Sequence, residues 1–267
     1  AHPQIGMVSL TGSVEAGVAV MQAAAPNITK VSLELGGKAP AIVMQDADLD
    51  LAVKAIKDSR IINAGQVCNC AERAYVHEAI ADEFIERVTE AMRQVKSGDP
   101  FDKKTDMGPL VNKVQLRKVT SAVEQAMKDG AELVLGGGSG SQSKGYFFQP
   151  TVLKNCSQSS SIMRQEIFGP VLPIVTFSNL DEAIEMANDS EYGLTSSIFT
   201  KSLDVAMRAA NELKFGETYV NREHFEAMQG YHAGWRKSGV GGADGKHGLE
   251  EFLQTHVVYM NYDMSKK

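Results

Sequence analysis

Short apolar segments alternate with longer segments in which apolar residues recur every three or four positions. The short segments predict strands, and the longer ones predict amphipathic helices. The predicted strands are 7–10, 31–35, 41–44, 74–77, 133–135, 151–153, 171–177, 196–200 and 218–221. The predicted helices are 14–25, 49–61, 80–95, 114–128, 181–188 and 203–213, with Ser13 and Asp48 as the caps of the first two. This alternation predicts an α/β fold with a mostly parallel sheet flanked by helices.

Two glycine-rich regions interrupt the alternation. Residues 136–145 are rich in glycine and serine and predict a flexible surface loop. Lys144 does not complete a phosphate-binding loop there, because the required Gly-Lys-Ser/Thr ending is absent. Residues 230–248 hold seven glycines without a helical period and predict a second loop. The short apolar segment 257–260 predicts a terminal strand. We expect this strand to pair with another subunit, because an unpaired strand edge favours aggregation.

The composition is that of an ordinary folded protein. The 267 residues are 43% hydrophobic and carry a net charge of −6 without long runs of one sign, which argues against disorder and against a nucleic-acid or anionic-membrane surface. No apolar run approaches the ~20 residues of a membrane span, so we expect a soluble chain. The first residues do not resemble a secretory signal, and the three cysteines cannot all pair. These observations predict a cytoplasmic location.

The strongest local signal is the sequence Gly-Gln-Val-Cys-Asn-Cys at 65–70. A cysteine in a glycine-containing loop after a helix is accessible, and its thiolate is a strong nucleophile. The alternative is that Cys68 and Cys70 are small buried hydrophobic residues, which is the commoner role of a cysteine. A metal site is disfavoured, because Cys-x-Cys is not a usual ligand spacing and no second Cys/His pair follows.

Three further motifs each allow a functional site, and each has a simpler structural alternative. Glu34 ends a predicted strand before two glycines, where a carboxylate with a raised pKa acts as a general base, although a surface turn is the simpler explanation. Thr-Gly-Ser at 11–13 places a helix N-terminus after a strand, which suits an anion, although many helices begin this way. Glu-Ile-Phe-Gly-Pro-Val at 166–171 enters a strand, and the alternative is a turn with one core phenylalanine.

Taken together, the four motifs resemble the signature series of the aldehyde dehydrogenase superfamily. Their order is Thr-Gly-Ser, Glu-Leu-Gly-Gly-Lys, Gly-Gln-x-Cys and Glu-x-Phe-Gly-Pro-Val, and the spacing of Glu34 and Cys68 is similar to that of the family. The stretches 65–73 and 221–239 resemble the lactaldehyde/glycolaldehyde dehydrogenase branch. The resemblance covers essentially the whole chain, but only the C-terminal, catalytic part of full-length members.

The resemblance implies a catalytic domain like that of aldehyde dehydrogenases, with a partial Rossmann-like edge. It also implies NAD-dependent oxidation, with NADP not excluded, of a small hydroxyaldehyde such as lactaldehyde or glycolaldehyde to the carboxylic acid. Cys68 is then the nucleophile that forms a thiohemiacetal and a thioester, and its backbone N–H donates to the oxyanion. Glu34 is the base that activates water to release the acid.

The same resemblance assigns further residues to the cofactor and to the substrate. The predicted cofactor-binding residues are Ser13, Glu34, Leu35, Gly36, Lys118, Glu166 and Phe168. Ser13 is expected at the pyrophosphate and Glu166 at the ribose hydroxyls, whereas Lys118 lies in a helix that is rich in lysine anyway. The predicted substrate-contacting residues are Asn69, Glu226 and His232, although a structural role suits Asn69 and an exposed position suits His232 equally well.

The resemblance also predicts the domain organisation. Residues 1–36 correspond to the end of an NAD-binding domain, 37–235 to the catalytic domain, and 236–267 to a C-terminal loop and oligomerisation strand, so we expect a homo-oligomer. Two hypotheses follow. The chain is part of a working NAD-dependent enzyme, or it is a truncated catalytic domain that acts as a binding or structural fragment or as a weak thiol esterase. We expect the chain alone to reduce NAD poorly, because most of the cofactor domain is missing.

Overall fold

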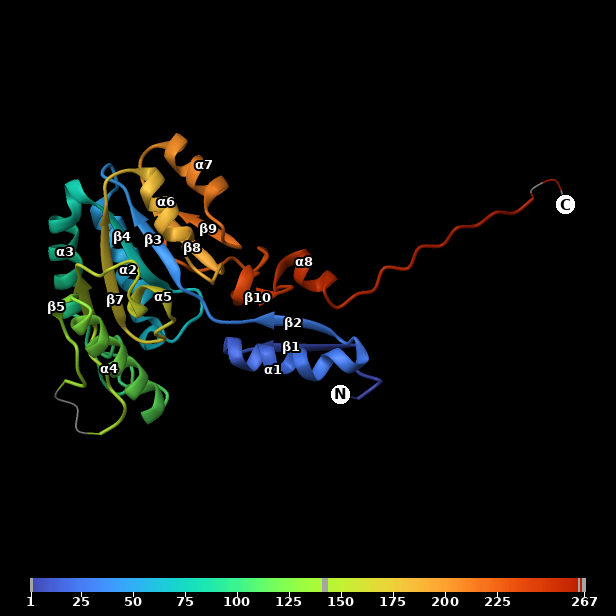
Figure 1. Ribbon diagram of the computed structural model, residues 1–267, viewed down its shortest axis with the longest axis horizontal. Coiled ribbons are helices and arrows are strands. Elements are labelled where there is room, and N and C mark those ends of the chain that lie inside the picture. The colour runs from blue at the N-terminus through green and yellow to red at the C-terminus, as the bar shows by residue number, and fades with distance from the viewer. Residues whose placement is uncertain (1, 141–143, 264, 266–267) are drawn as a thin grey trace.

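The computed structural model describes residues 2–140, 144–263 and 265. Within these residues the strands form a seven-stranded sheet and a three-stranded sheet, and the chain passes from one to the other between β2 (Lys30–Glu34) and β3 (Ala39–Val43). Figure 1 shows the small sheet and its helix beside the larger layered body, with the C-terminal residues extending away from both. Part of the predicted loop at 136–145, namely 141–143, lies outside the described residues.

The large sheet is mostly parallel, which confirms the predicted fold class. In the part of the chain that the structure describes, its strand order is β5-β6-β7-β4-β3-β8-β9, and only the β5–β6 pair is antiparallel. Besides β3, its strands are β4 (Ala71–His77), β5 (Glu132–Leu135), β6 (Thr151–Lys154), β7 (Val171–Phe177), β8 (Thr195–Phe199) and β9 (Glu217–Val220). Because β3, β4 and β7 are parallel, their N-terminal ends lie at the same end of the sheet, and the segments that precede them meet there.

Helices cover both faces of the large sheet. They are α2 (Leu49–Ile61), α3 (Ala81–Arg93), α4 (Lys113–Lys128), the short α5 (Ser161–Arg164), α6 (Leu180–Asn188) and α7 (Leu203–Glu212). Asp48 caps α2, because its side chain accepts a hydrogen bond of 3.1 Å from the Leu51 N–H. Except for the segment 257–260, the predicted helices and strands agree with the observed ones to within about three residues at each end, whereas α5 and the elements after residue 235 are not predicted. No helix among the described residues is long and apolar enough to span a bilayer.

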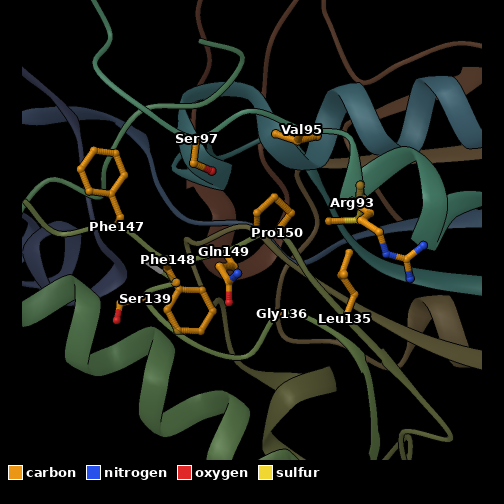
Figure 2. Close-up of a pocket in the computed structure, with 12 residues that line it drawn as sticks. Arg93, Val95, Ser97, Leu135, Gly136, Ser139, Phe147, Phe148, Gln149 and Pro150 are labelled. Atoms are coloured by element: carbon orange, nitrogen blue, oxygen red, sulfur yellow. The ribbon is translucent and has the colours of Figure 1, made fainter. Parts of the chain in front are cut away.

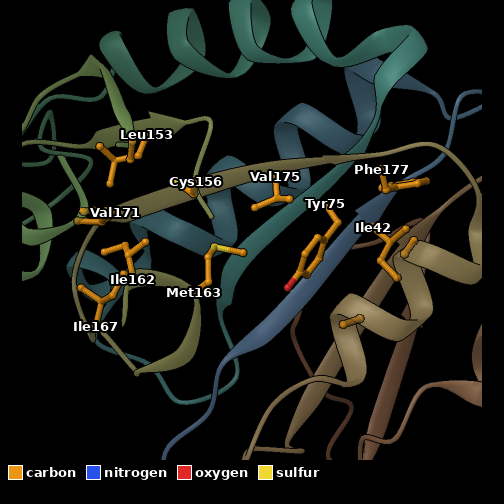
Figure 3. Packing of buried hydrophobic residues seen from close by; sticks show 14 of the residues in the cluster. Ile42, Tyr75, Leu153, Cys156, Ile162, Met163, Ile167, Val171, Val175 and Phe177 are labelled. Atoms are coloured by element: carbon orange, nitrogen blue, oxygen red, sulfur yellow. The ribbon is translucent and has the colours of Figure 1, made fainter. Parts of the chain in front are cut away.

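Two hydrophobic clusters lie on opposite faces of this sheet, because successive strand residues point to opposite sides. In β3, Ile42 belongs to one cluster, whereas Ala41 and Val43 belong to the other. The first cluster includes residues of α4, α5, α6 and α7, and Figure 3 shows members of it, Tyr75 among them. The second packs mainly against α2 and α3. The large sheet is therefore the middle layer of a three-layer α/β arrangement.

The small sheet carries the first helix of the chain. Among the described residues its order is β1-β2-β10, with β1 (Met7–Thr11) parallel and β10 (Gly239–Val240) antiparallel to β2. The helix α1 (Val14–Ala24) begins after Ser13, whose Oγ accepts a hydrogen bond of 3.2 Å from the Ala16 N–H. The strand β1 is partly exposed, and in the described chain it pairs with β2 along one edge only.

The C-terminal region differs from its prediction. Residues 230–248 are not one loop, because they contain a 3-10 turn at Arg236–Ser238, the strand β10 and the start of α8 (Gly245–Glu250). A Cβ on Gly239 would lie 2.4 Å from the Leu33 carbonyl oxygen, so glycine permits the pairing of β10 with β2. Residues 257–260 are 62–93% exposed and pair with no described strand. Their pairing with another subunit stays a prediction.

A cavity of about 220 Å³ lies at the outer edge of the large sheet, away from the predicted site residues. Figure 2 shows its lining, which comes from the end of α3, from β5 and from the segment that leads to β6, with Arg93, Leu135 and Phe148 among its residues. Its described lining includes no Cys, His, Asp or Glu side chain. Among its described residues, this cavity therefore presents no thiol, imidazole or carboxylate group.

Candidate active site

Cys68 lies in a tight loop between α2 and β4, at the end of the large sheet where the parallel strands begin. Asn63 and Ala64 have left-handed backbones with φ of 47° and 56°, and Gly65 follows with φ of 72°. A Cβ on Gly65 would lie 2.3 Å from the Gly169 carbonyl oxygen, so this position requires glycine. These three residues turn the chain sharply and place the partly buried Cys68 against the segment that follows β2.

The Gly-Gly pair after Glu34 permits two close approaches. A Cβ on Gly37 would lie 2.4 Å from the Cys68 carbonyl oxygen. A Cβ on Gly36 would lie 2.5 Å from Oε2 of Glu166. Neither contact is compatible with a side chain. The pair therefore brings Glu34, Cys68 and Glu166 to one place, although they come from three distant parts of the sequence.

Replacing Gly37 by alanine is expected to displace the Cys68 loop and to lower the free energy of unfolding by about 1–3 kcal/mol, because the added methyl group overpacks against backbone. Urea unfolding followed by circular dichroism measures this loss. Gly6→Ala is the matched control, since a Cβ on Gly6 meets no atom within 4 Å. Equal unfolding free energies for the two variants would contradict the prediction.

A cavity of about 450 Å³ opens in front of Cys68. It is lined by Thr11, Gly12, Ser13, Glu34, Leu35, Gly36, Gln66, Val67, Cys68, Gln115, Lys118, Glu166 and Phe168. Every residue that the sequence predicts as catalytic or cofactor-binding is in this set. Ser13 stands at the N-terminus of α1, where free N–H groups and the helix dipole attract an anion. The structure therefore gathers the four motifs around one concave site.

Glu34 is buried at the end of β2. Neither of its carboxylate oxygens has a hydrogen-bond partner among the described residues. Burial raises the pKa of Glu34 from 4.5 to about 7, and the nearby His232 imidazole acts against this rise. Three carboxylates, those of Glu217, Asp244 and Glu226, add to it. A carboxylate with two open acceptor atoms and a pKa near 7 is suited to take a proton from water at neutral pH.

Glu166 lies on another wall of the same cavity. Its Oε1 accepts a hydrogen bond of 2.8 Å from the Gly37 N–H. Burial raises the pKa of Glu166 to about 7, and the neighbouring Glu72 carboxylate adds to the rise. Glu72 also accepts hydrogen bonds from the N–H groups of Ile167 and Phe168, at 3.1 and 2.9 Å. Glu72 therefore fixes the segment that carries two predicted cofactor-binding residues.

The three thiols of the chain differ in access. Cys68 is partly exposed and lines the cavity, whereas Cys70 and Cys156 are buried. Burial raises the pKa of both buried thiols to about 11. The sulfur of Cys70 also accepts a hydrogen bond of 2.9 Å from Nη2 of the buried Arg60. Cys70 and Cys156 are therefore small buried residues of the kind considered as the alternative, whereas Cys68 is not.

The three predicted substrate residues lie outside the lining of this cavity. Asn69 follows Cys68 in the loop, and its Nδ2 donates a hydrogen bond of 2.5 Å to Oε2 of Glu226. The carbonyl oxygen of Asn69 accepts two further hydrogen bonds, so this residue also has the structural role considered above. His232 is only 8% exposed, so the alternative of an exposed position is wrong. Its Nε2 lies 3.6 Å from Oε2 of Glu34.

Several residues of the site are not assigned from the sequence. Those in the cavity lining are Thr11, Gly12, Gln66, Val67 and Gln115. Gln115 donates from Nε2 to the Phe168 carbonyl oxygen at 2.7 Å, and nothing in the pattern of its helix indicates this contact. Glu72 could have been found from the sequence, because the charged Glu-Arg pair at 72–73 interrupts an apolar strand. In the part of the chain that the structure describes, no group of three or more His, Cys, Asp or Glu residues could hold a metal ion.

The chain matches the model of one protein family, described as the aldehyde dehydrogenase family, over residues 1–258. Lactaldehyde dehydrogenase of Escherichia coli strain K12 is 61% identical to it over 97% of this chain and 54% of its own length. A crystal structure of lactaldehyde dehydrogenase from Escherichia coli is 62% identical in sequence and has a TM-score of 0.95, covering 97% of this chain and 54% of that chain.

Two further solved structures contain dinucleotides. A 3,6-anhydro-L-galactose dehydrogenase in complex with NADP is 46% identical, with a TM-score of 0.95 over 97% of this chain and 55% of that chain. Betaine aldehyde dehydrogenase from Staphylococcus aureus in complex with NAD+ is 39% identical, with a TM-score of 0.93 over 95% of this chain and 51% of that chain. The chain therefore spans about half the length of the relatives that it matches.

Proposed function

Because the chain belongs to the aldehyde dehydrogenase family, we propose that the protein oxidises a small hydroxyaldehyde, such as lactaldehyde or glycolaldehyde, to the carboxylic acid with NAD. The observation that carries the proposal is a single cavity lined by both the accessible Cys68 thiol and the buried Glu34 carboxylate. A thiolate is the nucleophile that this oxidation requires, and a carboxylate with a raised pKa is the base that its hydrolytic step requires.

The residues of the cavity fit one end of a dinucleotide. Ser13 and the first N–H groups of α1 would hold a phosphate, and the Glu166 carboxylate would accept hydrogen bonds from ribose hydroxyls. Leu35, Gly36, Lys118 and Phe168 complete the set of proposed cofactor contacts. When bound, NAD supplies the acceptor for the hydride that leaves the thiohemiacetal. NADP is not excluded, because solved relatives carry either dinucleotide.

Cys68 performs the first chemical step. Its thiolate adds to the aldehyde carbon, and the carbonyl oxygen becomes the oxyanion of a thiohemiacetal. The backbone N–H of Cys68 donates a hydrogen bond to that oxygen, which stabilises the charge as it develops. After oxidation the substrate stays bound to the Cys68 sulfur as a thioester. This thioester hydrolyses readily, because a thiolate is a good leaving group.

Glu34 performs the release of the acid. It takes a proton from water, the resulting hydroxide adds to the thioester carbon, and the carbon–sulfur bond breaks to regenerate the Cys68 thiolate. The proton on Glu34 then passes to solvent. Because burial raises the pKa of Glu34 to about 7, the carboxylate form is half populated near that pH. We expect hydrolysis to accelerate as the pH rises through about 7 and to level off above it.

The polar groups beside Cys68 suit an aldehyde with a hydroxyl group. Glu226 presents a carboxylate, Asn69 an amide and His232 an imidazole, so a hydroxyl can find both an acceptor and a donor. An apolar aldehyde would leave these groups without partners, which disfavours its binding. The 61% identity to lactaldehyde dehydrogenase of Escherichia coli supports the same substrate class.

We also propose that residues 1–36 belong to the NAD-binding domain, 37–235 to the catalytic domain, and 236–267 to a C-terminal loop and strand that join subunits. The passage from the small sheet to the large sheet supports the first boundary, because it falls between β2 and β3. The exposed apolar side chains at 257–260 support the role of that segment in a homo-oligomer.

The test of the proposed function is the formation of NADH by the full-length protein with lactaldehyde and with glycolaldehyde. We expect both to give NADH faster than propionaldehyde, which lacks the hydroxyl group and serves as the control substrate. Failure to form NADH with any small aldehyde would contradict the proposal. Calorimetric titration of residues 1–267 with NAD then distinguishes a chain that holds the cofactor from a fragment that does not.

A further inference from the structure

A largely buried pair of titratable residues, Glu217 and His232, lies next to Glu34. Glu217 is on β9, and its Oε1 lies 2.5 Å from Nδ1 of His232. The opposite ring nitrogen, Nε2, lies 3.6 Å from Oε2 of Glu34. The side chains of His232 and Glu217 are 10% and 13% exposed, so water screens these charges little. The imidazole therefore stands between two carboxylates, one on each side of the ring.

The backbone holds the His232 ring in this orientation. The His232 N–H donates to the Ala243 carbonyl oxygen at 3.0 Å, and the Ala243 N–H donates back to the His232 carbonyl oxygen at 2.7 Å. A Cβ on Gly242 would lie 2.6 Å from the same His232 oxygen, so the two segments pack as closely as backbones can. With the backbone fixed and Nδ1 bonded to Glu217, only Nε2 can face Glu34.

Glu217 is itself fixed by a second contact. The Tyr219 hydroxyl donates a hydrogen bond to Oε2 of Glu217. The Tyr219 ring stacks on His224 with 5.6 Å between the ring centroids. Both carboxylate oxygens of Glu217 therefore have partners, and neither is free to rotate away from His232. Such a held carboxylate orients an imidazole and favours its charged form.

We propose, building on the function proposed above, that Glu217 is a positioning residue that keeps His232 as an imidazolium with its Nε2–H facing Glu34, and that this cation keeps Glu34 ionised for the activation of water. Glu217 touches neither substrate nor cofactor, and it acts through His232. The cation opposes the three carboxylates that favour protonation of Glu34, and its Nε2 is closer to Glu34 than the Glu217 carboxylate on the far side of the ring.

The titratable groups around His232 agree with this role. Those facing the ring are Glu217 from β9, Glu34 from β2 and Cys68 from the loop before β4, while Glu226 and Asp244 act on Glu34. Burial lowers the pKa of His232, but its hydrogen bonds to Cys68 and Glu217 and the charges of Glu217 and Glu34 outweigh burial and raise the pKa to about 11. His232 is then an imidazolium throughout the pH range in which Glu34 titrates.

The variant Glu217→Gln removes the negative charge at this position but keeps a side chain of nearly the same shape. The glutamine amide oxygen can still accept the hydrogen bond from Nδ1 of His232, but it carries no charge to hold the ring protonated. His232 then becomes neutral at lower pH, and Glu34 loses its nearest cation. Loss of the cation 3.6 Å away raises the pKa of Glu34, whereas the simultaneous loss of the Glu217 carboxylate lowers it by less, so we expect a net rise of about one unit. Glu34 should therefore become a carboxylate only at higher pH.

Hydrolysis of p-nitrophenyl acetate reads out this change without a dinucleotide. The Cys68 thiolate attacks the acetyl carbon, p-nitrophenolate leaves, and an acetyl thioester forms on the sulfur. Water then adds to the thioester carbon while Glu34 takes its proton, the carbon–sulfur bond breaks, and acetate leaves. The initial burst of p-nitrophenolate reports acylation, and the steady rate that follows reports hydrolysis of the thioester.

We expect the acid limb of the steady rate to move up by about one pH unit in Glu217→Gln, so that its rate at pH 6.5 is roughly fivefold to tenfold below that of the unmodified protein. The two rates should converge near pH 9, where Glu34 is ionised in both. Glu223→Gln is the matched control, because it removes a half-exposed carboxylate next to Arg222, away from the ring. Its pH profile should not move. A Glu217→Gln profile lowered equally at every pH would overturn the proposal, because this is the mark of a purely structural role.

The inference is also tested by a nitrogen NMR titration of the His232 ring in the unmodified protein. This measurement does not depend on whether the variant folds, and it does not depend on catalysis. We expect both ring nitrogens to carry protons at pH 7.5, with the signals assigned by their loss in His232→Gln. A neutral ring at that pH would overturn the inference. If p-nitrophenyl acetate gives no burst at Cys68, the proposed function fails, and this titration still decides whether Glu217 holds a cation beside Glu34.

Discussion

Replacing Cys68 by serine is expected to lower aldehyde oxidation at least roughly a thousandfold and to abolish the fast reaction of the protein with iodoacetamide. A serine hydroxyl is a far weaker nucleophile than a thiolate at neutral pH, and an alkoxide is a poorer leaving group than a thiolate. Cys68 is also the partly exposed thiol that lines the cavity, whereas Cys70 and Cys156 are buried. NADH formation by the full-length protein and mass mapping after limiting iodoacetamide measure the two effects.

The matched control for this variant is Cys156→Ala. Cys156 lies in the hydrophobic cluster against the large sheet, and burial raises its thiol pKa to about 11, so it should react slowly with iodoacetamide. We expect the control to retain both activity and labelling of Cys68. Preferential labelling of Cys156, or unchanged activity in Cys68→Ser, would show that Cys68 is not the nucleophile.

Residues with local roles could be predicted from the sequence, because the physical reason lies within a few positions. Ser13 and Asp48 cap helices through their own side chains and the N–H groups three residues on. Cys68 and Glu34 stand in short motifs with glycines, and these glycines permit the approaches that bring them to one cavity. The alternation of strands and helices likewise indicates the parallel sheet.

Contacts between distant segments could not be predicted in this way. Glu217 is an ordinary polar residue of a strand, and its contact with His232 depends on how β9 packs against the C-terminal region. The helix α8 is also missed, because its glycines oppose helix formation. One of them, Gly248, has a packing reason that only the fold reveals, since a Cβ there would lie 2.6 Å from the Ala243 backbone. Tertiary packing overrides local propensity at these positions.

The second large effect is expected from Glu72→Ala, which should lower the free energy of unfolding by about 3–5 kcal/mol. Oε2 of Glu72 lies 2.8 Å from Nζ of Lys38, Oε1 lies 3.6 Å from Nη1 of Arg60, and all three side chains are at most 3% exposed. Burial raises the pKa of Glu72, but the two cations and the hydrogen bonds it accepts outweigh burial and lower its pKa overall. Removing the carboxylate therefore leaves two cations buried without a counter-charge.

Urea unfolding at neutral pH measures this loss, and Glu132→Ala is the matched control. Glu132 also pairs with a lysine, Lys154, but the pair lies at the surface, where water screens it, so its removal should change the unfolding free energy little. Glu72→Ala should also weaken NAD binding by the full-length protein, because the N–H groups of Ile167 and Phe168 lose their acceptor and the segment that carries Glu166 is released. If the two variants unfold at the same urea concentration, the buried charges do not stabilise this segment, and Glu166 is then held by the Gly37 N–H and by the hydrogen bond from Gln115 to Phe168.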